Sequence, residues 1–218
     1  RHRLTNLVQR APDALEEWPL DKPRPKSRSS NQGNSIHCFR HRLEPELADG
    51  LRHLARRNGA SLHAVMLALV GLEVKRRTGR TSFLLGTAAS TRHSAAEAGV
   101  IGYFVNMLPM CVDHGNQGTV DAAVCAMQRE LSEALQHCAY PFSRIYGDFL
   151  SEHPRTVHPA RYPLFDIAVT ENPALDSSQD QALSFAPLRR QESGAIDYER
   201  LDHGPAQDLV LVHEGQND

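Results

Sequence analysis

The sequence predicts an α/β fold in which helices pack on a mixed β-sheet. Short apolar runs of strand type alternate with longer segments of helical periodicity, in the order strand, two helices, two strands, two helices and three strands. Alternation of this kind indicates layers of helix and sheet around a common core. The 218 residues, 40% hydrophobic and 23% charged, have the composition of an ordinary globular domain.

The N-terminal part of the chain is expected to be an extended connection. Residues 4–15 have the pattern of a short helix, and residues 22–34 read KPRPKSRSSNQGN, which is too polar and proline-rich to bury much surface. We therefore predict a linker with a short helix over residues 1–34 and a folded unit over residues 35–218. A strand with mixed faces, residues 35–43, opens this unit.

Two helices are expected next, and local signals define their ends. Pro45 suits a first helical turn, and Asn58-Gly59 supplies a stop. Ser61 is a natural N-cap for the second helix, which should end at Thr78-Gly79. Because this second helix is apolar over much of its surface, we expect it to be largely buried.

The remaining elements are predicted from short apolar runs and from the proline, polar and capping residues that separate them. A strand over 82–87 leads into a polar loop over 90–97, and a second strand is expected over 100–112, where Pro109 indicates an edge, a bulge or a bend. Thr119 can cap a long helix, and a short helix should follow Tyr140-Pro141. A proline-rich loop and three strands complete the pattern, the strands over residues 164–170, 183–190 and 208–214.

Composition and motifs argue against several classes of protein. The formal net charge is -2, so no electrostatic footprint for nucleic acid is expected. No apolar run reaches membrane-spanning length and no signal peptide is visible, which favours a cytoplasmic protein without a membrane partner. The four cysteines form no CxxC pair. The sequence also lacks GxSxG, HExxH, SxxK with its companion motifs, and a glycine-rich phosphate loop.

We predict no metal site or catalytic site from the individual histidines and carboxylates of the sequence. His37, Cys38 and His41 lie close in sequence, but in an extended segment Cys38 points away from the two histidines. We therefore expect packed or solvated side chains there and no metal site. Asp166 and Glu171 are interpreted as strand-end residues.

The most informative segment is Gly99–Met110, which reads GVIGYFVNMLPM. Asn106 stands in an apolar run, where a side-chain amide must find hydrogen-bond partners or cost free energy. The amide either holds backbone segments together through hydrogen bonds, as a backbone staple, or faces a polar cavity. The pattern favours the staple.

This segment resembles the IGxFVNT motif of condensation domains in nonribosomal peptide synthetases, with Met107 in place of threonine. Four further segments resemble motifs of the same family, in family order. WPLDKPRP resembles the LPTDRPRP linker between two lobes, and Gly86-Thr87 with Arg92 resembles the GTPxxxR loop. HCAYPF is similar to (H/N)QDxPFE, and PARYPLF is similar to RDxSRNPLF.

The resemblance implies a chloramphenicol acetyltransferase-like fold, in which two related lobes enclose a tunnel. This chain would be the C-terminal lobe, incomplete at its own C-terminus, and its partners would be the N-terminal lobe and peptidyl or aminoacyl carrier proteins. No cofactor would bind directly, since the phosphopantetheine arm belongs to the carrier proteins. The catalytic HHxxxDG motif is absent from this sequence, so we assign no catalytic residue. The parent domain would join a donor thioester to an acceptor amine, whereas activity of the isolated chain stays open.

The resemblance also implies a set of residues at or near the tunnel wall: Asn106, Phe104, Gly102, Gly86, Thr87, Ser90 and Arg92. Several alternatives remain beside the peptide-forming reading. One is a carrier-docking module without chemistry. Another is an epimerisation, heterocyclisation or free-standing acyltransferase relative of the same fold, although the FVN sequence favours the peptide-forming branch. A more distant one is an unrelated hydrolase, which would need a serine and a histidine in contact.

Overall fold

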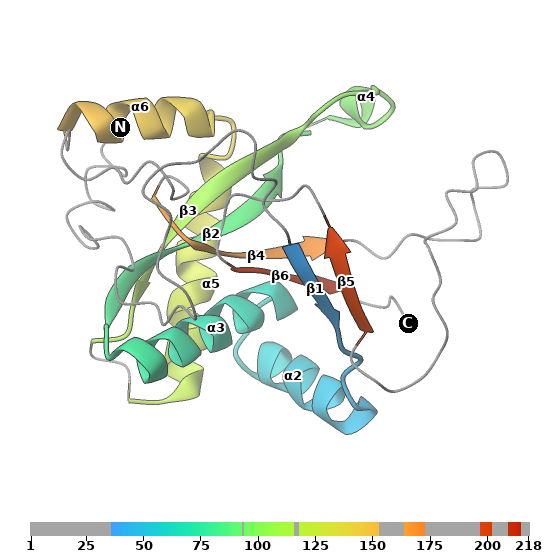
Figure 1. Ribbon diagram of the computed structural model, residues 1–218, viewed down its shortest axis with the longest axis vertical. Coiled ribbons are helices and arrows are strands. Elements are labelled where there is room, and N and C mark those ends of the chain that lie inside the picture. Colours follow the sequence, from blue (N-terminus) through green and yellow to red (C-terminus); the bar gives the residue numbers. More distant parts are fainter. Residues whose placement is uncertain are drawn as a thin grey trace, which may run out of the picture.

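The computed structural model describes residues 36–92, 94–115, 118–152, 164–172, 197–201 and 209–214. The structure contains a four-stranded mixed sheet and several helices (Figure 1), which confirms the predicted α/β class. The strand order is β3-β2-β4-β6. The strands are β2 (Ser82–Ser90), β3 (Val105–Asp113), β4 (Ile167–Asn172) and β6 (Leu209–Glu214). β2 pairs antiparallel with β3, whereas β4 pairs parallel with both β2 and β6.

Two further strands form a separate two-stranded sheet. β1 (Ile36–Arg40) pairs antiparallel with β5 (Asp197–Leu201), with Ile36 opposite Leu201. The strand at the start of the folded unit was predicted. β5 was not predicted, because its sequence DYERL shows no apolar alternation. The strand expected over 183–190 and the linker over 1–34 lie outside the described residues.

The main helices are α2 (Pro45–Arg57), α3 (Leu62–Thr78), α5 (Val120–Gln136) and α6 (Phe142–Glu152). α3 and α5 begin directly after the predicted N-cap residues Ser61 and Thr119, and α2 and α3 end at the predicted stops. The Ser61 hydroxyl accepts a hydrogen bond from the Ala64 N–H at 3.1 Å, and the Thr119 hydroxyl accepts one from the Ala122 N–H at 3.2 Å. Gly79 ends α3 with a φ of 73°, a left-handed conformation that glycine adopts without strain.

The sheet separates two apolar cores because strand side chains alternate between its faces. Phe83 and Leu85 of β2 belong to the larger core, together with side chains of α3 and α5. Leu84 belongs to the smaller core on the opposite face, with Phe165 and Ala168. Residues along both sides of α3 are buried, which confirms the expectation for this helix.

The hairpin formed by β2 and β3 differs in detail from the prediction. β2 continues to Ser90, and the expected polar loop contains a short helix, α4 (Ala95–Ala98), at the end of the hairpin (Figure 1). A capping box between Ser94 and Glu97 holds this helix. Pro109 lies within β3, which stands at one end of the strand order in this sheet. Of the three predicted alternatives, an edge, a bulge or a bend, the strand order agrees with the edge.

No helix in the part of the chain that the structure describes is both long enough and apolar enough to span a membrane.

Candidate functional site

Two of the segments that carry the family resemblance, residues 86–92 and 99–110, contact each other in the structure. The guanidinium carbon of Arg92 lies 4.0 Å from the ring centroid of Phe104, a cation–π distance. The Thr91 N–H donates to the Phe104 carbonyl at 2.8 Å. The Arg92 guanidinium also donates to the Glu97 carbonyl. These contacts fix the loop between β2 and β3 at the end of the hairpin.

Asn106 of β3 is a backbone staple, the alternative that its apolar surroundings favoured. Its side-chain amide donates to the carbonyls of Cys138 and Tyr140, each at 2.8 Å. Its side-chain carbonyl accepts from the Phe142 N–H at 2.9 Å. One side chain therefore holds the turn between α5 and α6 against the hairpin, which is why an asparagine fits this apolar run.

Gly86 and Thr87 lie in the middle of β2 and face opposite sides of the sheet. A Cβ atom built on Gly86 would meet ring atoms of Phe165 at 2.1 and 2.5 Å, so the ring lies directly on the glycine backbone. Thr87 is fully buried on the helix side. Phe165 in turn packs against Phe142, with ring centroids 5.8 Å apart.

The predicted tunnel residues therefore form two groups in this structure. Phe104, Ser90 and Arg92 gather at the end of the hairpin, and Gly102 lies beside the Phe104 ring. The other three, Gly86, Thr87 and Asn106, have packing or stapling contacts further along the sheet. Their placement in the wall of a tunnel stays a prediction.

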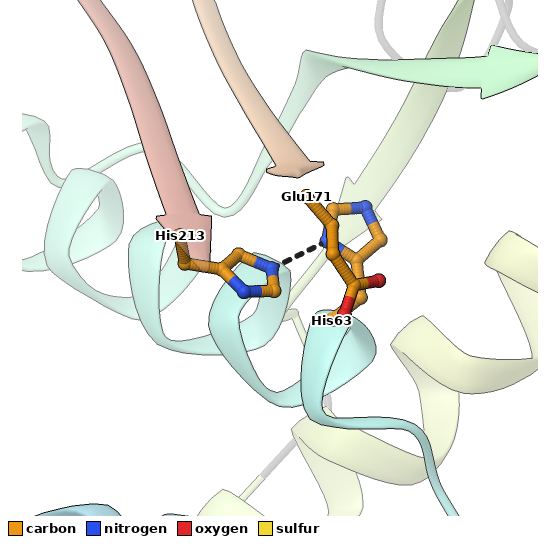
Figure 2. A group of neighbouring side chains, drawn as sticks. All are labelled: His63, Glu171 and His213. Carbon is orange, nitrogen blue, oxygen red and sulfur yellow. Dashed lines mark hydrogen bonds between the residues drawn. The ribbon is translucent and has the colours of Figure 1, made fainter. Parts of the chain in front are cut away.

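A second cluster, which the sequence did not predict, lies at the carboxyl ends of the parallel strands. Figure 2 shows that His63 comes from the first turn of α3, Glu171 from the end of β4 and His213 from the end of β6. Glu171 and His213 are paired in register across β4 and β6. Because Val169 and Leu211 contact the larger core two residues earlier, strand alternation turns Glu171 and His213 toward the same helix side.

The two imidazoles of this cluster are connected by short hydrogen bonds. His63 Nδ1 lies 2.9 Å from His213 Nε2, and His63 Nε2 lies 2.7 Å from the Thr87 hydroxyl. The rings are tilted by 31° with centroids 5.2 Å apart. His63 is buried, His213 is partly exposed and Glu171 is exposed. Nδ1 of His213 is buried and finds no hydrogen-bond partner among the described residues.

Burial determines the electrostatics of this cluster. Burial and, as a smaller contribution, the neighbouring His213 lower the pKa of His63 from 6.5 to about 4. Burial also lowers the pKa of His213, while the Glu171 carboxylate opposes that change. Both rings are therefore neutral at pH 7 and can each offer a nitrogen lone pair. One potential ligand atom from each of the three side chains lies within 4.8 Å of the other two, which is compatible with metal coordination after small movements.

The sequence pattern of β4 and β6 does indicate this cluster, but only once the pairing of the two strands is known. In LVLVHE and IAVTEN a polar side chain takes the next helix-facing position after an apolar alternation. Without knowledge that β4 and β6 are parallel neighbours, each residue is merely a strand end. This cluster shares no residue with His37, Cys38 and His41, the group that was compared with a metal site in the sequence.

Comparison with known families gives the family of the chain. Residues 10–200 match the model of the condensation domain, which covers most of the sequence. The chain belongs to the condensation-domain family.

Curated relatives of this condensation-domain chain are peptide synthetases. It is 31% identical over 146 residues to surfactin synthase subunit 1 of Bacillus subtilis, covering 67% of this chain and 4% of that protein. It is 26% identical over 195 residues to phosphinothricin tripeptide synthetase PhsC of Streptomyces viridochromogenes, covering 89% of this chain and 17% of that protein. The chain thus spans only a small part of the length of these relatives.

Solved structures share the fold of this condensation-domain chain. The X-domain from teicoplanin biosynthesis aligns with a TM-score of 0.73 at 20% identity, over 100% of this chain and 45% of that one. The condensation domain from Monacolin K polyketide synthase MokA aligns with a TM-score of 0.62 at 25% identity, over 90% and 42%. The X-domain in its complex with OxyB aligns with a TM-score of 0.70 at 18% identity, over 100% and 44%.

The lowered pKa of His63 predicts a pH-dependent stability of this condensation-domain chain. Between pH 6.5 and about 4 the unfolded chain binds a proton at His63 that the folded chain does not. Stability from this residue is therefore complete above pH 6.5 and decreases as the pH falls toward 4, by about 2 kcal/mol after allowance for partial solvation. Urea unfolding across this range, in buffer with a metal chelator, measures the effect.

Two variants separate His63 from other titrating groups. His63→Gln keeps an amide that can bond to Thr87 but cannot titrate, so the decrease between pH 6.5 and 4 should become shallower. The exposed His53→Gln on α2 should retain the wild-type pH dependence. An unchanged slope in His63→Gln would contradict the assignment to His63.

Proposed function

We propose that this chain is the C-terminal lobe of a nonribosomal peptide synthetase condensation domain. In the parent protein, the domain forms an amide bond between a donor thioester and an acceptor amine, each bound to a carrier protein. The observation that carries the proposal is the condensation-domain match over residues 10–200 of a chain with this α/β fold. The peptide synthetases among the curated relatives support the same reaction.

The fraction of each similar solved chain that aligns with this chain supports the assignment to a single lobe. The whole of this chain corresponds to 45% of the X-domain chain, and 90% of it corresponds to 42% of the MokA condensation domain. A domain of two related lobes would give shares of this size. The proposed boundaries are a linker over residues 1–34 and the lobe over residues 35–218.

Exposed apolar side chains at the end of the β2–β3 hairpin support a partner lobe. Ile101 is 101% exposed and Tyr103 is 86% exposed, and Val100 and Val105 are also exposed. Large apolar side chains gathered at one protruding end are typical of an interaction surface. We propose that the N-terminal lobe covers this hairpin tip, defined by residues 100–105.

The proposed chemistry rests mainly on positioning. Two substrates tethered to carrier proteins by phosphopantetheine arms would meet inside the tunnel, and holding them together replaces a bimolecular encounter. In this proposal Phe104 and Arg92 at the hairpin end lie near the tunnel. The catalytic histidine of HHxxxDG would come from the other lobe, so this chain supplies wall and docking surface.

Reconstitution tests this function directly. We expect amide product from two loaded carrier proteins when this chain is combined with the N-terminal lobe encoded upstream, and none from this chain alone. Product from this chain alone would overturn the assignment of the catalytic residue to the other lobe. Absence of product despite a stable complex of the two lobes would overturn the proposed peptide-forming role.

A matched pair of variants tests the contact surface in the same experiment. Ile101→Ser with Tyr103→Ser should weaken association of the two lobes by about tenfold, measured by light scattering or calorimetry. Leu135→Ser removes a comparable exposed side chain from α5, far from the hairpin tip in sequence, and should leave association unchanged.

A docking module without chemistry is the second candidate. The observation that favours it is the similarity in fold to an X-domain that was solved in a complex with OxyB. Under this alternative, the two lobes would bind carrier proteins or another enzyme, but the reconstituted mixture would form no amide.

A further inference from the structure

The cluster of His63, Glu171 and His213 has no place in the proposed amide-forming reaction. Its side chains come from three elements, and His63 and His213 are 150 residues apart in the sequence. It lies at the carboxyl ends of parallel strands, which is where open α/β sheets commonly place ligands. The composition of the cluster indicates what kind of ligand that would be.

We infer that His63, Glu171 and His213 form a binding site for a single divalent transition-metal ion of the zinc class. Two imidazole nitrogens and one carboxylate are a ligand set that zinc uses in proteins, with a fourth position open to water. Cysteine is absent from the cluster, and two nitrogen donors disfavour calcium and magnesium, which prefer oxygen.

The distances require only small movements to reach coordination geometry. His63 Nδ1 and His213 Nε2 are 2.9 Å apart. Two nitrogens bound tetrahedrally to zinc lie about 3.3 Å apart, because each Zn–N bond is about 2.0–2.1 Å long. The two rings need to separate by only a few tenths of an ångström. Glu171 is exposed and its side chain has free torsions, so its carboxylate can close the remaining gap within the 4.8 Å cluster.

The surrounding contacts orient His63 as a ligand. Its Nε2 atom lies 2.7 Å from the Thr87 hydroxyl, so an N–H on Nε2 can donate to that oxygen, and the Nδ1 lone pair, which faces His213 Nε2, can coordinate. A metal-bound histidine in proteins usually has a second-nitrogen partner of this kind. Thr87 is itself fully buried in β2, which fixes the hydroxyl in place. The neutral state of both rings at pH 7 agrees with this role, since a protonated imidazole cannot bind a metal.

A bound ion would connect the ends of β4 and β6 to the start of α3. β6 stands at the end of the strand order in the four-stranded sheet, with β4 as its neighbour. A ligand that binds only the folded chain raises its stability in proportion to the logarithm of the free ligand concentration. The inference is independent of the proposed amide-forming activity, so the failure of either leaves the other intact.

The test uses the purified 218-residue chain after removal of metals with a chelator. Zn²⁺ is titrated in competition with a chromophoric chelator, thermal unfolding is recorded with and without Zn²⁺, and Co²⁺ serves as a spectroscopic substitute. We expect one tightly bound Zn²⁺ per chain, a raised unfolding temperature, and the visible absorption of four-coordinate Co²⁺.

Variants assign the binding to this cluster. Glu171→Gln and His213→Gln should each weaken Zn²⁺ binding by about tenfold to a hundredfold or more and remove the stabilisation by Zn²⁺. His41→Gln and His53→Gln, at exposed histidines outside the cluster, should bind Zn²⁺ like the wild type. If His213→Gln does not fold, the exposed Glu171→Gln decides the question.

Three outcomes would overturn the inference. Wild-type affinity for Zn²⁺ in both Glu171→Gln and His213→Gln would place the ion elsewhere. Equal losses in the cluster variants and in His41→Gln or His53→Gln would indicate diffuse binding to many histidines. Absence of Zn²⁺ binding by the wild-type chain would leave His63 and His213 as a hydrogen-bonded pair without a metal.

Discussion

Replacement of Gly86 by alanine is expected to lower the free energy of unfolding by about 3 kcal/mol or more. The new Cβ would lie 2.1 Å from one ring atom of Phe165 and 2.5 Å from two others. That ring is only 2% exposed and belongs to the smaller core, so it cannot move without displacing its neighbours. Urea or thermal unfolding of the purified variant measures the loss.

Two further variants show whether the contact with Phe165 causes this loss. In the double variant Gly86→Ala with Phe165→Leu, part of the loss should be recovered relative to the sum of the single changes, because the smaller side chain leaves room for the Cβ. Gly99→Ala is the matched control: a Cβ at Gly99 meets nothing within 4 Å, and its φ of −86° suits alanine. Equal losses at Gly86 and Gly99 would refute the steric explanation.

Replacement of Asn106 by alanine is the second change with a large expected effect, about 3 kcal/mol. Three backbone hydrogen bonds to the turn between α5 and α6 are lost together, and the carbonyl of the buried Cys138 loses a donor. We expect lower stability and faster hydrogen exchange in residues 138–142, measured by chemical unfolding and by amide exchange.

Asn106→Asp separates the hydrogen-bonding explanation from a simple loss of volume. An aspartate has nearly the same shape and can still accept from the Phe142 N–H, but its carboxylate would face the carbonyls of Cys138 and Tyr140. It should therefore be at least as unstable as the alanine variant at pH 7. Asn172→Ala, at an exposed asparagine of β4, is the control and should be nearly neutral. A stable Asn106→Asp variant would be inconsistent with the staple.

Features of the fold that depend on neighbouring residues were predictable from the sequence. Ser61 and Thr119 cap their helices through atoms three residues away, so both helix starts could be placed from local chemistry alone. Pro109 indicated an edge, a bulge or a bend because its missing N–H disfavours a central position, and β3 stands at an edge of the described sheet. The short helix α4 was missed because its four residues carry no apolar periodicity, although the Ser94 and Glu97 capping pair is visible in the sequence.

Features that depend on distant pairing were only partly predictable. The requirement that Asn106 find partners followed from its apolar surroundings, but the identity of those partners depends on a turn more than 30 residues away. The cluster of His63, Glu171 and His213 depends on the register of β4 with β6 and on the position of α3. Neither is encoded in the periodicity of a single segment, so the residues looked like isolated polar side chains.

The pairing of β1 with β5 has a consequence for the order of folding. These strands stand near opposite ends of the described chain, so closing the loop between them costs about 4 kcal/mol of chain entropy. A two-stranded sheet is at best marginally stable in water and cannot offset that cost alone. The four-stranded sheet must therefore assemble first and bring the two strands together. During synthesis the full register of β1 with β5 cannot form until residue 201 has left the ribosome, so the backbone N–H and C=O groups of residues 36–40 lack their partners in β5 until then.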